Sequence, residues 1–238
     1  YTDVGLFTCK ESFGEDATAV FNMLSGYSEP LSWNKLAVAP LWLKDKFLYW
    51  IDREKKNAIK GETARIIAKM NSLCDKDIIA ALYEASTAGV QIDLIVRGIC
   101  CLKVGIPGIS ENIRVRSIVG QFLEHSRIFY FENGGKSEIY CGSADWMPRN
   151  LERRVEILFP IEDVMLKKKA YHILEGELRD TIKASIMLAD GRYEKIDRRG
   201  KEAYSSQDVF VLEAKEEAKK SKEGINKRVF VPAQHVEG

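Results

Sequence analysis

Long apolar runs, CxxC pairs and an excess of charge of one sign are all missing from this sequence. No apolar stretch reaches the roughly 18 residues that a membrane-spanning helix needs. The five cysteines are too few for a disulfide scaffold and occur in apolar runs, which predicts reduced core thiols in a cytoplasmic protein; peripheral membrane association stays open. Basic and acidic residues number 36 and 35, so nucleic acid is not an expected partner. An anion site must therefore be a local cluster of basic residues.

The pattern of apolar residues predicts strands that alternate with helices. Residues 35–97 read as strand, helix, strand, helix and strand, which is typical of an α/β sheet with helices packed on its faces. The expected strands are residues 4–8, 35–40, 64–70, 91–97, 127–131, 138–141 and 154–159, and the expected helices are residues 16–24, 41–59, 75–88 and 163–189. Beyond Gly191 the chain is strongly charged, and residues 213–222 indicate a surface helix before a loose tail. The first residues are strand-like and lack an initiator Met, so we expect a chain cut from a longer protein.

His125 and Arg127 are the first candidates for chemistry. They occupy alternate positions at the start of an expected strand, so in an extended chain their side chains would face the same side. Imidazole titrates near neutral pH, and a guanidinium offers a planar fork of donors that suits phosphate oxygens. Downstream, Ser143 could orient the ring, and Asp145 or Arg149 could hold partners. The alternative is that the histidine is structural.

Arg97 is the second candidate. It ends an expected strand, at the edge of an α/β sheet where ligands collect, and Gly98 would let a ligand approach the backbone closely. A surface ion pair is the alternative reading. The loop of residues 105–112, followed by Arg114 and Arg116, could present backbone N–H groups to an anion or be only a surface connection.

These residues form a variant of a known motif. The pattern His125-x-Arg127, Glu132 and Gly142-Ser143-x-Asp145 resembles the HxKxxxxD…GSxN motif of the phospholipase D superfamily. Arg replaces the motif's Lys, Glu its Asp and Asp its Asn, and the gap before Gly-Ser is longer. The same departures resemble the last domain of polyphosphate kinases of the long, phospholipase-D-like type. Further matching segments are residues 1–3, 67–73, 82–86, 88–90, 94–100, 108–114, 122–127, 132–135 and 142–150.

The resemblance implies a phospholipase-D-like mixed β-sheet flanked by helices, with a helical carboxy-terminal extension. Residues 1–34 would end a preceding domain of the same type, residues 35–200 would form the second such domain, and residues 201–238 a charged helix and loose tail. The family transfers the terminal phosphate of ATP reversibly to long-chain polyphosphate, through a phosphohistidine that would lie upstream of this chain. The expected partners are ATP or ADP, polyphosphate, the missing amino-terminal domains and further copies in a homo-oligomer, without nucleic acid.

The resemblance also implies roles for single residues. Tyr1 matches the nucleotide-contacting tyrosine, Arg97 the phosphate-binding arginine and His125 the second active-site histidine, while Arg127 and Arg149 would add positive charge. Mg²⁺ would arrive with ATP and take its protein ligands from the missing upstream domain, with no metal ligand in this chain. The fragment alone would be inactive. Two alternatives are a phospholipase-D-like phosphodiesterase or nuclease, and a non-catalytic nucleotide- or polyphosphate-binding module.

Overall fold

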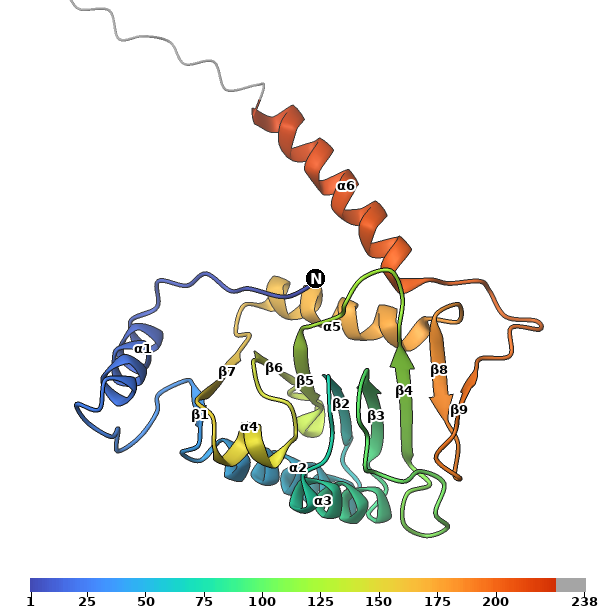
Figure 1. Cartoon of the computed structure of the whole chain (residues 1–238), viewed down its shortest axis with the longest axis horizontal. Helices are drawn as coiled ribbons and strands as arrows, with labels where there is room; N and C mark the ends of the chain where they lie inside the picture. Colours follow the sequence, from blue (N-terminus) through green and yellow to red (C-terminus); the bar gives the residue numbers. More distant parts are fainter. Residues whose placement is uncertain (226–238) are drawn as a thin grey trace, which may run out of the picture.

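The computed structural model describes residues 1–225, and within them one nine-stranded sheet organises the chain (Figure 1). The strand order is β1-β7-β6-β5-β2-β3-β4-β8-β9. β2, β3 and β4 run parallel, and the other neighbours pair antiparallel, so the sheet is mixed as expected. The strands are β1 (Ala37–Ala39), β2 (Arg65–Met70), β3 (Gln91–Val96), β4 (Ile113–Ile118), β5 (Arg127–Phe131), β6 (Glu138–Gly142), β7 (Glu156–Pro160), β8 (Ala184–Met187) and β9 (Tyr193–Lys195).

Helices cover both faces of the sheet. In Figure 1, α2 and α3 lie along one side, α5 lies along the other, and α6 projects away from the sheet. A short 3₁₀ turn, η1 (Asn133–Gly135), follows β5. The helices are α1 (Glu11–Leu24), α2 (Leu43–Ile59), α3 (Lys76–Thr87), α4 (Pro148–Glu152), α5 (Val164–Arg179) and α6 (Ser206–Ile225).

Strand β2 shows how the sequence builds these layers. Ile66, Ala68 and Met70 belong to the core under α2 and α3, whereas Ile67 belongs to the core under α5. A strand buried on both faces has apolar residues in succession rather than in alternation, which is the pattern that the sequence shows here. Lys69 is the exception, a charged residue on the α5 face. The predicted strand–helix alternation of residues 35–97 is confirmed.

The predicted long helix of residues 163–189 is wrong in its second half. α5 ends at Arg179, and the chain returns as β8 beside β4. The turn is made by Asp180, whose Oδ1 accepts hydrogen bonds from the backbone N–H groups of the three residues 182–184, at 2.7–3.1 Å. Helical spacing continued by chance through Ile182, but an aspartate that binds the backbone so fully ends a helix.

Other expectations also need correction. Residues 4–8 form no strand, and β4, β8, β9 and α4 lie in segments where none was expected. Cys9 and Cys101 are exposed, so not all thiols lie in the core. The charged helix around residues 213–222 is confirmed as part of α6. Residues 226–238 of the expected tail lie outside the described part of the chain.

Candidate phosphoryl-transfer site

The first residues of the chain lie beside His125 because Thr2 pairs with the segment that precedes β5. Thr2 N–H donates to Leu123 O at 3.0 Å, and His125 N–H donates to Thr2 O at 2.9 Å. This bridge brings residues more than 120 positions apart into contact. It places Tyr1 and Asp3, the neighbours of Thr2, against the imidazole.

The imidazole of His125 lies between three side chains. Nδ1 is 2.8 Å from Asp3 Oδ2, and the ring of Tyr1 lies 4.7 Å away, centre to centre. Arg127 Nη1 is 3.1 Å from Nδ1 and 3.0 Å from Nε2, and donates to His125 O at 2.7 Å. Nearly equal distances to both ring nitrogens place this Nη1 over the face of the ring and off the lone pair of Nε2. With Nδ1–H donating to Asp3, the in-plane position at Nε2 has no partner within the described residues.

The carboxylate of Asp3 also responds to this contact. Partial burial raises the pKa of Asp3, but the hydrogen bonds from His125 and from Val4 N–H outweigh that effect, so the pKa lies below its usual value. Asp3 is therefore charged at neutral pH. A carboxylate held against one ring nitrogen fixes the orientation of the imidazole.

Arg127 is locked in place by Asp145. Asp145 is 4% exposed, and its carboxylate accepts from Arg127 Nε at 3.1 Å and from Arg127 Nη2 at 3.4 Å. Its Oδ1 also accepts from Asn71 N–H, at the end of β2, at 2.8 Å. A carboxylate that accepts from two nitrogens of the same guanidinium holds that group in one geometry. The pair therefore joins β5 to the carboxyl end of β2.

The Gly142-Ser143 element serves the sheet rather than the histidine. Ser143 N–H donates to Ile157 O at 3.0 Å, and Ser143 Oγ accepts from Ile157 N–H at 3.1 Å. A Cβ on Gly142 would lie 2.3 Å from Ile157 O, so only glycine permits this approach of β7. The expectation that Ser143 orients the imidazole finds no support, since its hydroxyl is engaged by Ile157.

Arg97 lies at the same edge of the sheet, directly after β3. Its backbone N–H donates to Met70 O at 3.3 Å, next to Asn71. The side chain is partly buried, Nε is buried without a hydrogen-bond partner, and no ion pair involves Arg97 within the described part of the chain. The proposed surface ion pair is therefore not formed. The adjacent Gly98 is constrained by Asn71 O, which would lie 2.9 Å from a Cβ.

The remaining candidates lie apart from this centre. Arg149 is exposed on α4, and none of the described residues forms an ion pair with it. Glu132 follows the opposite end of β5, where its carboxylate accepts from the hydroxyl of Tyr130.

The two arginines after the loop of residues 105–112 are both engaged. Arg114 Nε donates to Asp93 Oδ1 at 2.7 Å, and Arg116 Nη1 donates to Glu177 O at 3.2 Å. With both arginines engaged, the loop of residues 105–112 is better explained as a surface connection.

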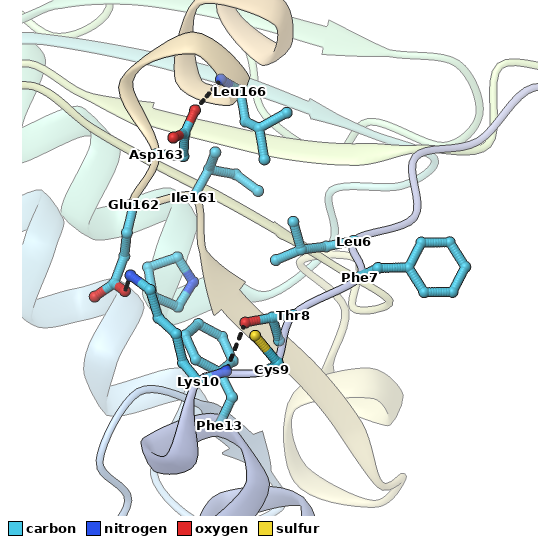
Figure 2. A pocket seen from close by; sticks show the side chains of 11 residues that line it. Leu6, Phe7, Thr8, Cys9, Lys10, Phe13, Ile161, Glu162, Asp163 and Leu166 are labelled. Atoms are coloured by element: carbon cyan, nitrogen blue, oxygen red, sulfur yellow. Dashed lines mark hydrogen bonds and ion pairs between the residues drawn. The ribbon is translucent and has the colours of Figure 1, made fainter. Parts of the chain in front are cut away.

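Two hollows lie near the amino-terminal segment. A groove of about 620 Å³ between that segment, α5 and α6 is lined by Tyr1 and Asp3 but not by His125, Arg97 or Arg127. A hollow of about 260 Å³ lies between residues 6–10 and the start of α5 (Figure 2). Figure 2 shows Phe7 pointing away from it into open space. Neither hollow holds the histidine, so the candidate centre is an open edge of the sheet.

No group of three or more His, Cys, Asp or Glu side chains in residues 1–225 is arranged to hold a metal ion. The two carboxylates at the centre, Asp3 and Asp145, are already engaged by His125 and Arg127. The donors present therefore do not fit a Mg²⁺ site. Within the same residues, no helix is both long and apolar enough to cross a bilayer.

Comparison with known proteins gives a consistent family. Residues 36–207 match the family model described as polyphosphate kinase C-terminal domain 2. A polyphosphate kinase of Synechocystis is 52% identical over 90% of this chain, and one of Lactiplantibacillus plantarum is 49% identical over 98%. The crystal structure of polyphosphate kinase from Porphyromonas gingivalis superposes with a TM-score of 0.84 at 40% identity, covering 89% of this chain. This chain spans about a third of each relative: 30%, 33% and 33%, respectively.

Proposed function

Because the chain belongs to the polyphosphate kinase family, we propose that it is the carboxy-terminal catalytic part of an enzyme that transfers the terminal phosphate of ATP reversibly to polyphosphate. One observation carries the proposal most directly. Tyr1, Asp3 and Arg127 surround His125, and Arg97, a cation without an ion-pair partner in the described residues, lies at the same sheet edge. Phosphoryl transfer requires mainly positioning and positive charge around the moving group, and this edge supplies both.

Each residue has a role in this proposal. Arg97 binds phosphate oxygens of ATP, and the ring of Tyr1, 81% exposed, contacts the nucleotide. His125 takes up or releases a proton at Nε2, or donates from Nε2 to the moving phosphoryl group, while Asp3 holds Nδ1. Arg127 stabilises charge mainly by holding the imidazole, since Asp145 already occupies its fork. Arg149 extends the positive charge toward polyphosphate.

The phosphohistidine of the proposed reaction lies in sequence upstream of Tyr1. A covalent phosphoryl-histidine divides the transfer into two steps, each with a single displacement at phosphorus. His125 serves the second side of that centre and is not the nucleophile. Mg²⁺ would arrive with ATP and offset phosphate charge, with protein ligands outside the described residues. The proposed assembly is a homo-oligomer of the longer protein.

A second candidate is a non-catalytic module that binds nucleotide or polyphosphate. The observation in its favour is that the described residues hold one histidine at the centre, His125, and no metal site. A phospholipase-D-like phosphodiesterase is the less favoured enzyme, because Arg127 stands where that motif has lysine and is tied to Asp145.

The test is phosphate transfer from ATP labelled at the terminal phosphate. The full-length protein should incorporate the label into acid-labile polyphosphate, whereas the 238-residue chain alone should incorporate none. His125→Gln in the full-length protein should lower the rate at least ~10²-fold, the usual contribution of general acid–base catalysis. His172→Gln is the matched control, since His172 lies on α5 and contacts Glu213 at 3.0 Å. Near-wild-type synthesis by His125→Gln, or hydrolysis of phosphodiesters by the 238-residue chain, would refute the proposal.

A further inference from the structure

Lys69 is a buried lysine that the proposed chemistry does not use. It lies near the end of the central strand β2, on the face that packs against α5, and is 2% exposed. A buried ammonium group is costly unless it is paired and hydrogen-bonded. Its contacts should therefore reveal what it is for.

The ammonium group of Lys69 reaches both residues that flank His125. It donates to Ser126 Oγ at 2.9 Å and to Ser126 O at 3.1 Å, and it lies 3.8 Å from Glu124 Oε2. From the opposite side, Glu177 of α5 approaches it at 3.5 Å. Because residues 124 and 126 turn toward Lys69, the side chain of His125 between them is left facing the open edge, with 31% exposure.

Glu124 carries the connection to the amino-terminal segment. Its Oε2 accepts from Thr2 Oγ1 at 2.9 Å, and its Oε1 accepts from Gln207 Nε2, at the start of α6, at 2.8 Å. Thr2 is the residue whose backbone bonds to His125 N–H. Lys69, Glu124 and Thr2 thus form one continuous set of contacts behind the imidazole.

We propose that Lys69 is a positioning residue that holds Glu124 and Ser126 on either side of His125 and, through Glu124 and Thr2, sets Tyr1 and Asp3 against the imidazole. The cavity beside Lys69, which Arg97 also lines, measures about 10 Å³ and admits at most about one water molecule, so no phosphate group fits against the ammonium. Lys69 therefore acts through His125. The consequence for phosphate transfer rests on the proposed function, whereas the consequence for the structure around His125 does not.

The test compares Lys69→Met with Lys167→Met in the 238-residue chain labelled with ¹⁵N-histidine. Lys167 is a matched control because its Nζ donates to a backbone oxygen, Ser137 O, at 3.0 Å in a region remote from His125. Lys69→Met should speed exchange of the His125 amide proton by about tenfold or more, since that proton is held by Thr2 O. The ring ¹⁵N shifts of His125 should also lose the signature of an Nδ1–H donor in Lys69→Met and stay unchanged in Lys167→Met. An unchanged amide and ring in a folded Lys69→Met chain would overturn the proposal.

Ser126→Ala provides a milder variant in case Lys69→Met does not fold. It removes the hydroxyl acceptor of Lys69 and keeps the core intact, and should shift the same His125 signals in the same direction. In the full-length protein, Lys69→Met should lower kcat for phosphate transfer about tenfold or more, as a misplaced general acid or base does. If Lys69→Met speeds exchange of the His125 amide but the wild-type full-length protein transfers no phosphate, the positioning role is supported and the proposed function is refuted. If exchange is unchanged in Lys69→Met while the wild-type full-length protein transfers phosphate, the positioning role alone is refuted.

Discussion

Arg127 and Arg97 flank the end of β2 on either side, at the start of β5 and after β3, and they differ in their partners. Arg127 is neutralised by a buried carboxylate that also binds the backbone of Asn71. Arg97 forms no ion pair in the described residues, although it lines a small cavity with Glu124 and Glu177, and its Nε is buried without a partner. A buried paired cation is costly to remove and has little left for a ligand, whereas an unpaired one is available to an anion. The difference separates the residue that builds this edge from the residue that binds there.

Arg127→Ala should cause the largest loss of stability. Asp145 would keep its bond from Asn71 N–H but lose both guanidinium donors, and removing one partner of a buried ion pair costs about 3–5 kcal/mol. Urea unfolding at pH 7 measures the change. Arg192→Ala is the matched control, because Arg192 pairs with Asp190 at 2.7 Å on the exposed surface, where water screens the pair and its loss should hardly change stability. Equal losses in the two variants would show that the Arg127–Asp145 pair is not structural.

Glu177 adds a buried acidic side chain to this comparison of charged residues. Burial raises its pKa to about 8, against the opposing attraction of Lys69. Because the folded pKa lies above the ordinary value of 4.5, the stabilising effect of the bound proton is complete below pH 4.5 and is lost as the pH rises through 8. The free energy of unfolding should thus fall by about 2–4 kcal/mol between pH 5 and pH 9. Glu177→Gln should flatten this dependence, and a wild-type slope in that variant would exclude Glu177 as its source.

Arg97→Ala should show the opposite balance from Arg127→Ala. Stability should change by less than about 1 kcal/mol because no ion pair is broken, while the affinity of the full-length protein for ATP should fall by about 1.5–3 kcal/mol, the value of a charged hydrogen bond. Isothermal titration with ATP, alongside urea unfolding, separates the two effects. Arg149→Ala, on exposed α4, should weaken ATP binding less. Unchanged ATP affinity in Arg97→Ala would remove this arginine from the site.

The sequence predicted the centre of this fold well because it rests on local patterns. Helix α3, for example, follows from apolar spacing and from Asp75, whose side chain caps Asp77 and Ile78 N–H. The end of α5 was mispredicted, because the hydrogen bonds that hold Asp180 in the turn include one from Ser206, 26 residues away in sequence. Strand β4 was missed because Arg114 and Arg116 break its apolar pattern.

In the candidate site, too, the residues with a local sequence signal were predicted and those that depend on distant contacts were missed. His125, Arg127 and Asp145 stood out because motif spacing on neighbouring strands is a local signal. Asp3 and Lys69 were missed, because their contacts with residues 124–126 span 122 and 57 positions in sequence. No periodic pattern in the sequence predicts such a contact. A buried charge in an apolar strand, as at Lys69, was the one available signal, since charged residues are buried almost only when paired.

Ser143→Ala should have the smallest effect and tests whether the serine of the motif orients the imidazole. The hydroxyl accepts one hydrogen bond, from Ile157 N–H, in an exposed part of the β6–β7 pair. Its loss should cost about 0.5–1.5 kcal/mol in urea unfolding, because water can replace the missing acceptor. The ¹⁵N signals of the His125 ring should stay in place, since the contacts of that ring come from Tyr1, Asp3 and Arg127. A shift of those signals would instead restore the hypothesis that Ser143 orients the imidazole. It would also mean that the contacts around the Arg127–Asp145 pair at this edge of the sheet include Ser143.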